Sequence, residues 1–266
     1  MPQTTEESLI LGIVVIVGLI FGSFATALSY RIPRGKEFVV ERSSCTHCGH
    51  TLGFFDLFPI LSWIFLAGKC RYCKKTIGTK YLFTELAVAA LFAVVYIKMG
   101  ISLTSLILAS LSLCIVIMTV IDLEHYIIPD GINLAMFFLG VFNQVVVGAE
   151  LEQFLIGPAL GFGIGWLLRQ LMWVWKKKEG LGMGDVKFFA VAGIFLNAEL
   201  IITFLFLAGV IGVITAILWR MAGRGERFPF GPALAFALFI CLVAPEFHDW
   251  WRESIGRLIV GDGQFE

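Results

Sequence analysis

The sequence carries little charge. Only 15% of its 266 residues are Asp, Glu, Lys or Arg, 58% are hydrophobic, and the mean hydropathy is +0.88. A typical soluble domain is about one quarter charged. This composition therefore excludes a disordered chain, a basic nucleic-acid-binding domain and a secreted disulfide scaffold. A chain of this size cannot bury so much Leu, Ile, Val and Phe in one soluble core. The sequence predicts an all-α polytopic membrane protein that contacts the lipid bilayer and no nucleic acid.

Positive charge is also missing ahead of the first apolar run. The chain begins MPQTTEES, with no Lys or Arg, and the apolar run from Leu9 to Leu28 follows. A secretory signal has a basic start and a short apolar core. This run has about 20 residues, which is enough to span a bilayer. We expect a retained first helix with its N-terminus outside.

Hydropathy predicts about eight transmembrane helices in all. The segment 186–197 is short for a span, and the apolar stretch 54–67 is shorter than a span and contains Pro59. A length of about 14 residues suits an interfacial or re-entrant segment better than a span. The eight predicted spans are 9–28, 82–98, 103–121, 131–148, 154–175, 186–197, 199–219 and 232–248.

Lys and Arg residues gather on one side of this eight-span arrangement. Only Lys98, Arg252 and Arg257 fall on the other side, and Arg169 lies inside a span. Because short cytoplasmic loops are rich in Lys and Arg, the basic side is cytoplasmic and both termini are outside, in the inner membrane. The basic loops carry Arg31, Arg34, Lys36, Arg42, Lys69, Arg71, Lys74, Lys75 and Lys80, then Lys176, Lys177, Lys178 and Lys187, then Arg220, Arg224 and Arg227.

The first cytoplasmic loop contains two C-x2-C pairs separated by 21 residues. Four thiolates suit tetrahedral zinc with no open position, which makes a structural site. A loop of about 50 residues cannot build much core, and a metal would supply the missing folding free energy. The alternatives are two disulfides, which a reducing cytoplasm disfavours, or free thiols. We therefore predict one Zn²⁺ in a zinc-ribbon-like domain, with the ligands Cys45, Cys48, Cys70 and Cys73.

The remaining Cys and His residues have simpler interpretations. His47 and His50 could replace a Cys ligand, but solvated loop residues are the plainer interpretation. Cys114 and Cys241 each lie alone in an apolar span, where packing is the expected role.

Acidic residues beside the membrane are the candidates for chemistry, because an ionisable group in a span is costly. Asp122 ends an apolar run, Asp185 lies in Gly182-Met-Gly-Asp185, and Glu85 lies one turn into the second span. Asp122 and Asp185 map to the same cytoplasmic side. Two such carboxylates can share a proton, so that one activates water while the other protonates the leaving group.

The helix ends distinguish the two acids. Asp122 lies at a helix C-terminus, where the dipole disfavours an anion, and Asp185 lies at a helix N-terminus, where the dipole favours one. We expect Asp122 to hold the shared proton, although such a pair titrates as a unit. Physical reasoning alone leaves Glu124, His125 and Asp130 as rivals of Asp122; solvated loop positions for the first two and a helix N-cap for Asp130 are the simpler interpretations.

The motifs together resemble a known family, the bacterial type IV prepilin peptidases, which are the leader peptidase and N-methyltransferase enzymes of pilus and type II secretion systems. The resemblance covers nearly the whole chain. Besides the two cysteine pairs, it rests on Phe21-Gly-Ser-Phe24, Tyr30-Arg-Ile-Pro33, Pro59-Ile-Leu-Ser-Trp63, Tyr81-x-x-x-Glu85, Asp122…Ile128-Pro-Asp130, Gly182-Met-Gly-Asp-Val-Lys187 and Pro229-Phe-Gly-Pro232.

This resemblance implies an intramembrane aspartyl protease in which Asp122 and Asp185 are the catalytic pair. It implies cleavage of the leader from prepilins and pilin-like precursors after a Gly, followed by N-methylation with S-adenosylmethionine. We assign substrate contacts to Gly182, Gly184, Lys187 and Glu85. The expected domains are a first helix over 1–30, a cysteine-rich zinc domain over 31–80 and a seven-helix peptidase domain over 81–266.

Two other functions compete with this one. The first is a peptidase alone, in which the zinc loop is only a scaffold. The second is a membrane scaffold or a transporter, although a transporter would place acids near the bilayer midplane and often shows repeats. The sequence has no such repeat, no His-Glu-x-x-His of a metalloprotease, and no Gly-rich pattern that would locate S-adenosylmethionine. The oligomeric state and the particular pilin stay open.

Overall fold

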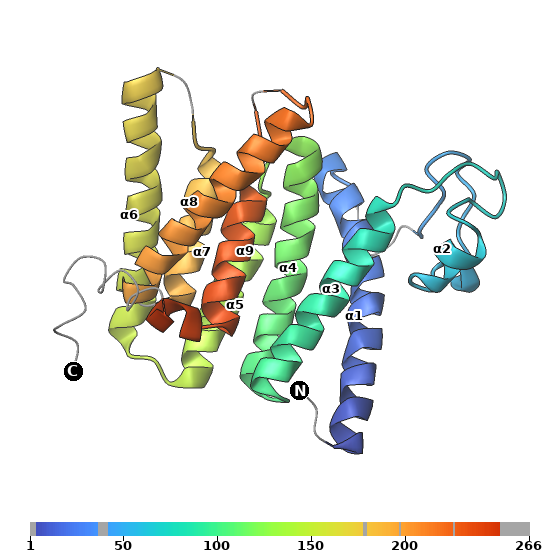
Figure 1. Ribbon diagram of the computed structural model, residues 1–266, viewed down its shortest axis with the longest axis horizontal. Helices are drawn as coiled ribbons and strands as arrows, with labels where there is room; N and C mark the ends of the chain where they lie inside the picture. The colour runs from blue at the N-terminus through green and yellow to red at the C-terminus, as the bar shows by residue number, and fades with distance from the viewer. Residues whose placement is uncertain (1–3, 37–41, 178–179, 197, 226, 251–266) are drawn as a thin grey trace. The chain divides into compact units, whose positions relative to one another are not determined.

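The protein is nearly all helical in a computed structural model that describes residues 4–36, 42–177, 180–196, 198–225 and 227–250 (Figure 1). The chain forms two compact units, Met1–Ile132 and Asn133–Glu266. Each unit contains long apolar helices, which agrees with the predicted all-α membrane class.

The first unit packs three long helices against one another. These are α1 (Thr5–Arg31), α3 (Lys80–Met99) and α4 (Leu103–His125). The cysteine loop connects α1 to α3 and lies at the end of α1 and the beginning of α3 (Figure 1). It contains the short helices η1 (Ile32–Arg34), η2 (Phe54–Asp56) and α2 (Leu61–Phe65).

The second unit holds most of α5 (Asp130–Val147), whose first three residues belong to the first unit. It continues with α6 (Leu151–Lys176), α7 (Met183–Phe195), α8 (Ala198–Met221) and α9 (Gly231–Val243). Helix α7 packs against α6, α8 and α9. Eight of its 13 residues, all between Val186 and Phe195, are buried.

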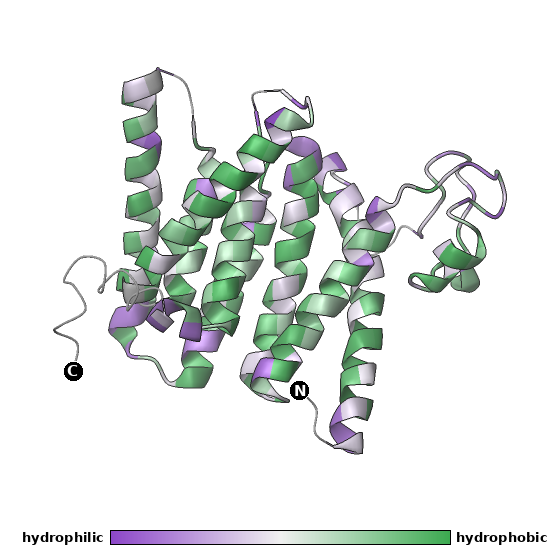
Figure 2. Ribbon diagram, viewed as in Figure 1, coloured by the Kyte–Doolittle hydropathy of each residue, from purple (hydrophilic) through white to green (hydrophobic). Residues whose placement is uncertain are grey.

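Six described helices are long and apolar enough to cross a membrane: α1, α3, α4, α5, α6 and α8. Helices α7 and α9 coincide with the other two predicted spans but have 13 residues each, which is short of the usual 17 or more. The count of eight therefore stays a prediction. Green apolar residues predominate along the long helices (Figure 2), as expected for helices that cross a lipid bilayer. Of the charges used to orient the chain, Lys178, Arg252 and Arg257 lie outside the described residues.

Glycines allow the helices of the first unit to approach closely. A Cβ on Gly18 would lie 2.6 Å from the Cα of Ala89, and one on Gly22 would lie 2.6 Å from the Cα of Glu85. Small residues at such a four-residue spacing let backbones meet inside a membrane, where packing rather than the hydrophobic effect holds helices together. The α1–α3 contact therefore fixes Glu85 against the face of α1.

The α6–α7 contact uses the same device. A Cβ on Gly157 would collide with the Gly193 carbonyl, and a Cβ on Gly161 would collide with the Phe189 carbonyl. These contacts hold α7 directly against α6. The beginning of α7, which carries Asp185, is thereby attached to a long membrane helix.

Candidate functional site

The first cysteine pair forms a tight knuckle. The N–H of Cys45 donates to the His50 carbonyl at 2.9 Å, and the N–H of Gly49 donates to the Cys45 carbonyl at 2.9 Å. Gly49 has a φ of +70°, a left-handed conformation that glycine adopts without steric cost. An isolated β-bridge between Ser44 and Thr51 closes the knuckle.

The second pair repeats this geometry with different side chains. The N–H of Cys70 donates to the Lys75 carbonyl at 2.8 Å, and the N–H of Lys74 donates to the Cys70 carbonyl at 3.0 Å. A β-bridge joins Lys69 to Thr76. Lys74 takes the place of Gly49 and has a φ of +60°, which costs a residue with a Cβ about 1 to 2 kcal/mol. The two knuckles are thus one structure used twice.

The four predicted ligands lie together. Their sulfur atoms are all within 4.8 Å of one another, and the Sγ atoms of Cys45 and Cys73 are 3.9 Å apart. Zinc–sulfur bonds of about 2.3 Å in a tetrahedron place sulfur atoms roughly 3.8 Å apart. The donor set and its spacing fit a metal ion such as Zn²⁺. His47 and His50 are exposed and outside this cluster, and Cys114 and Cys241 are free in α4 and α9.

The electrostatics of the cluster favour a bound cation. Burial disfavours the Cys45 thiolate, but donors from Cys48 and Cys70 outweigh it and lower the pKa of Cys45 to about 7. The N–H of His50 favours the Cys48 thiolate, yet desolvation and the adjacent Cys45 raise the pKa of Cys48 to about 11. The Cys45 thiol therefore ionises readily, and its negative charge disfavours ionisation of Cys48. A divalent cation bound to both sulfur atoms offsets that repulsion, because Cys binds metals as the thiolate.

Asp56 connects the segment between the knuckles to the second knuckle. Its carboxylate accepts from Arg71 Nε at 2.7 Å, from the Gly53 N–H at 3.0 Å and from the Tyr72 hydroxyl at 3.4 Å. Burial raises the pKa of Asp56, but the Gly53 and Arg71 hydrogen bonds outweigh burial and lower the pKa overall. The rings of Tyr72 and His50 lie 3.6 Å apart between centroids, so the knuckles also contact each other directly.

Glu85 holds the loop against α3. Its buried carboxylate accepts from the Ile60 N–H at 2.7 Å and from the Ser23 side chain. Ile60 has a φ of +58°, a rare conformation for a β-branched residue, which this bond helps to maintain. The structure thus gives Glu85 a loop-anchoring contact, and the substrate contact assigned to it stays a prediction.

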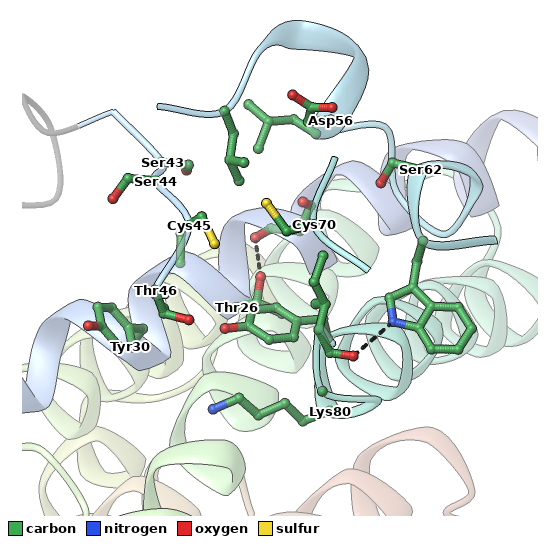
Figure 3. A pocket seen from close by; sticks show the side chains of 18 of the residues that line it. Thr26, Tyr30, Ser43, Ser44, Cys45, Thr46, Asp56, Ser62, Cys70 and Lys80 are labelled. Atoms are coloured by element: carbon green, nitrogen blue, oxygen red, sulfur yellow. Dashed lines mark hydrogen bonds between the residues drawn. The ribbon is translucent and has the colours of Figure 1, made fainter. Parts of the chain in front are cut away.

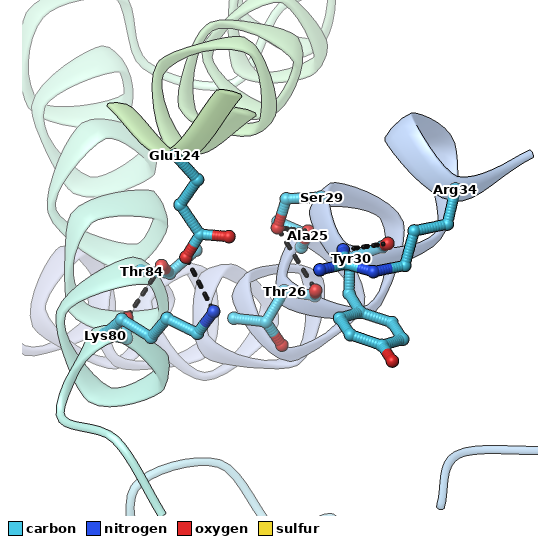
Figure 4. Close-up of polar contacts among 8 residues, drawn as sticks. All are labelled: Ala25, Thr26, Ser29, Tyr30, Arg34, Lys80, Thr84 and Glu124. Carbon is cyan, nitrogen blue, oxygen red and sulfur yellow. Dashed lines mark hydrogen bonds and ion pairs between the residues drawn. The ribbon is translucent and has the colours of Figure 1, made fainter. Parts of the chain in front are cut away.

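Asp122 lies in the last turn of α4, and only 5% of its surface is exposed. Tyr126 caps the helix after His125; its φ is +57° and its N–H donates to the Asp122 carbonyl at 2.9 Å. Its rival Glu124 accepts from Lys80 Nζ at 2.6 Å, which joins the end of α4 to the beginning of α3 (Figure 4). The other acidic rival, Asp130, is the first residue of α5.

Asp185 lies in the first turn of α7. Its Oδ2 accepts from the Gly182 N–H at 3.0 Å, which helps to cap the helix. Gly182 has an ordinary φ of −67°, so the backbone turn does not require a glycine. A Cβ there would instead lie 2.9 Å from Asp185 Oδ2, so glycine leaves room for the carboxylate. Lys187 is half-buried on the next turn of α7.

Sequence reasoning missed Asn133. This residue of α5 is 4% exposed, and its Nδ2 donates to the Gly184 carbonyl at 3.0 Å, next to Asp185. Its Oδ1 is buried with no hydrogen-bond partner among the described residues. The available signal was an amide side chain inside a predicted span, since polar groups in spans are costly, but Asn143 and Gln144 share that signal.

Two family models match the chain, one after the other. The model described as Bacterial Peptidase A24 N-terminal domain matches residues 16–99, and the Type IV leader peptidase family matches residues 106–217. A Prepilin leader peptidase/N-methyltransferase of Stutzerimonas stutzeri is 30% identical over 256 residues, which cover 86% of this chain and 89% of that protein. The chain belongs to the type IV leader peptidase family.

Further relatives with the same name support this membership. The protein of Pseudomonas aeruginosa is 29% identical over 91% of each chain, and that of Aeromonas salmonicida is 32% identical over 82% of this chain and 74% of its own. No solved structure gives a significant match. The protein is therefore an integral membrane enzyme of a peptidase family whose relatives also carry the name N-methyltransferase.

Proposed function

We propose that this leader peptidase family member is an aspartyl endopeptidase that cuts type IV prepilins and pilin-like type II secretion precursors after Gly, at the cytoplasmic membrane face. The catalytic pair is Asp122 and Asp185. One observation carries the proposal. Two membrane-length helices, α5 and α6, separate the end of α4 from the beginning of α7. The two acids therefore emerge on the same face.

The cysteine loop emerges on that face as well, because α3 and α4 separate it from Asp122 by two crossings. The basic residues of the loop make this face cytoplasmic by the positive-inside rule. Both ends of an eight-span chain then lie outside, in the inner membrane. In the proposed organisation, residues 1–30 form the first helix, 31–80 the zinc domain and 81–266 the peptidase domain.

The two acids have different roles in proton transfer. Hydrogen bonding from the Gly182 N–H and the N-terminus of α7 favour the Asp185 carboxylate, whereas the C-terminus of α4 disfavours an anion at Asp122. Asp122 therefore holds the shared proton at rest. Asp185 removes a proton from the attacking water, and Asp122 protonates the departing amine as the peptide bond breaks. The pair titrates as a unit.

Substrate contacts surround Asp185 in this proposal. Gly182 and Gly184 let the precursor backbone approach the carboxylate, because neither carries a side chain. Lys187, half-buried on the same helix, provides a cation beside it. Glu85 contributes through the loop that it anchors.

The cysteine cluster holds a structural Zn²⁺ through Cys45, Cys48, Cys70 and Cys73. Four thiolates leave no open coordination position, so the ion folds the loop and does not catalyse. The second activity is N-methylation of the newly exposed N-terminal residue, with S-adenosylmethionine as the methyl donor. It needs a neutral amine aligned with the methyl carbon, and no proton relay between aspartates.

The decisive experiment incubates purified enzyme with a precursor pilin and follows leader loss and the gain of one CH2 unit by mass spectrometry. Asp122→Asn and Asp185→Asn keep the side-chain shape but cannot share a proton, and each should abolish cleavage. Glu124→Gln, which removes only the ion pair with Lys80, should retain it. Normal cleavage by Asp122→Asn rejects the aspartyl mechanism. Cleavage without any methylation by the parent enzyme leaves a peptidase with a scaffolding zinc loop.

A further inference from the structure

A cavity of about 460 Å³ lies between the cysteine loop and the ends of α1 and α3, entirely within the first unit (Figure 3). Ser23 and Thr26 of α1 and Glu85 of α3 line it on the membrane side. Cys45 and Cys70 line it on the loop side. The metal knuckles therefore form part of its wall.

Four of the motifs that the aspartate pair does not use contribute residues to this cavity. Phe21-Gly-Ser-Phe24 contributes Ser23, Tyr30-Arg-Ile-Pro33 contributes Tyr30 and Arg31, and Pro59-Ile-Leu-Ser-Trp63 contributes Ser62 and Trp63. Tyr81-x-x-x-Glu85 contributes both of its named residues. Residues far apart in the sequence thus build one site, and proton transfer between Asp122 and Asp185 requires none of them.

The lining has both signs of charge together with aromatic rings. Two lining residues, Asp56 and Glu85, are acidic, and six are cationic: Arg31, Arg34, Lys36, Arg42, Arg71 and Lys80. Besides the imidazole of His47, the rings of Tyr30, Trp63 and Tyr81 lie among Ser and Thr hydroxyls. A ligand with a carboxylate, an ammonium group and a flat base finds a counterpart for each in such a lining. The volume also lies within the range of small-molecule sites, roughly 300 to 1,000 Å³.

We propose that this cavity binds S-adenosylmethionine, an inference that rests on the proposed methyltransferase activity. The donor has an α-carboxylate, an α-ammonium, a sulfonium and an adenine ring, which matches the mixed lining. In the transfer, the nitrogen of the new N-terminus forms a bond to the methyl carbon while the carbon–sulfur bond breaks. S-adenosylhomocysteine leaves, and the methylated ammonium gives its extra proton to water.

Within the first unit, the cavity is also close to Asp122, one of the two proposed catalytic acids. Lys80 lines the cavity, and its Nζ lies 2.6 Å from Glu124 Oε1 in the last turn of α4, two positions after Asp122. A newly cut N-terminus at Asp122 therefore emerges near the cavity wall. Loss of the metal would deform the loop side of the cavity first, which connects the cysteine cluster to methylation rather than to proton transfer.

The test measures binding of tritium-labelled S-adenosylmethionine to the purified full-length protein, with no pilin present. Ala27 lines the cavity from α1, and Ala27→Phe fills it without removing a hydrogen bond. Ile20→Phe is the matched control on α1, because Ile20 is 56% exposed and does not line the cavity. The parent and the control should bind the donor, with competition by S-adenosylhomocysteine. The affinity of Ala27→Phe for S-adenosylmethionine should fall at least tenfold, while its leader cleavage persists.

Photo-crosslinking of the labelled donor to the parent protein gives a second result that does not depend on any variant. Labelled peptides containing Tyr30, Trp63 or Tyr81 support the proposal, and labelling confined to residues 133–266 overturns it. Unchanged binding by Ala27→Phe overturns the cavity assignment while the methyltransferase function stands. If that variant keeps the donor but loses co-purified phospholipid, a lipid headgroup occupies the cavity. A parent that neither binds the donor nor methylates pilin rejects the methyltransferase function itself.

Discussion

The side-chain amide of Asn133 donates to the Gly184 carbonyl at 3.0 Å, one residue before Asp185. A second amide on the same helix, that of Gln144, donates to the Ile194 carbonyl at 2.6 Å near the other end of α7. Both Asn133 and Gln144 are buried. The two bonds attach α5 to both ends of α7, but only one of them lies beside the proposed catalytic acid.

These bonds form a matched pair for mutation. Asn133→Leu and Gln144→Leu each remove one hydrogen bond from a buried side-chain amide, which costs about 0.5 to 1.5 kcal/mol of unfolding free energy. Only Asn133→Leu should also lower kcat for leader cleavage, by roughly tenfold or more, because a misplaced catalytic group loses alignment. It should alter the pH–rate profile as well. Equal kcat values for the two variants at equal loss of thermal stability would give Asn133 a purely structural role.

Gly182 provides space for the Asp185 carboxylate. Gly182→Ala places a Cβ against Oδ2, and the carboxylate must move. We expect cleavage to fall several-fold with a change of less than about 1 kcal/mol in stability, since the backbone at 182 suits any residue. Gly209→Ala in α8 is the control, because a Cβ there meets open space. Cleavage kinetics and thermal unfolding of the two variants test this expectation. Full activity in Gly182→Ala would contradict the proposal that Gly182 provides space for the Asp185 carboxylate.

Local patterns predicted a large part of this structure. Each predicted span coincides with a helix, because the length and apolar composition of a span are properties of consecutive residues and can be read directly from the sequence. The four cysteines gather because C-x2-C spacing fixes each knuckle locally. The predicted interfacial segment 54–67 is broken into η2 and α2 around Pro59, and is no span.

Contacts between distant segments could not be predicted from the sequence. The carboxylate of Glu85 anchors Ile60, and Lys80 pairs with Glu124, across 25 and 44 positions of the chain. Hydrophobic periodicity does not predict such bonds, since they depend on how the helices pack. The cavity under the loop was missed for the same reason: its lining comes from four separate motifs, and none of them has the Gly-rich pattern of a nucleotide site.

Metal removal should unfold the cysteine loop and leave the helices intact. Purified protein should contain about one zinc ion for its four-thiolate cluster. Cys45→Ser with Cys48→Ser should release the ion and make residues 42–79 sensitive to protease, while the far-ultraviolet spectrum keeps its helical signal. Elemental analysis measures the ion, and limited proteolysis measures the loop. A reduced native protein with no bound metal contradicts the assignment.

The two knuckles differ at one position with a left-handed backbone, occupied by Gly49 in the first and Lys74 in the second. Lys74→Gly should stabilise the loop by about 1 kcal/mol, because it relieves the cost of a Cβ at positive φ. Gly49→Lys should destabilise it by a similar amount. The rate of zinc release to a chelator reports both effects. Slower release from Gly49→Lys than from the parent would show that the knuckles are not equivalent.

The α2 segment should lie in the lipid interface. The Ile60 N–H, immediately before α2, is bound by Glu85, which lies five residues into α3 and therefore about 7 Å along its axis. This bond holds the beginning of α2 at the depth of a membrane helix. The side chains around it are apolar and exposed, with Phe54 and Phe55 at 73% and Phe65 at 83%. Such a surface is unstable in water and favourable at a bilayer boundary.

A photoreactive benzoylphenylalanine at position 65 tests this location in native membranes. It replaces one exposed aromatic ring with another, so the fold should tolerate it. We expect it to crosslink to phospholipid, detected as a lipid-sized mass on the 61–68 peptide. The same residue at Lys75, an exposed position of the second knuckle, should not crosslink to lipid. Equal lipid labelling at both positions, or labelling at neither, would place α2 outside the interface and leave its phenylalanines for a protein partner such as the precursor.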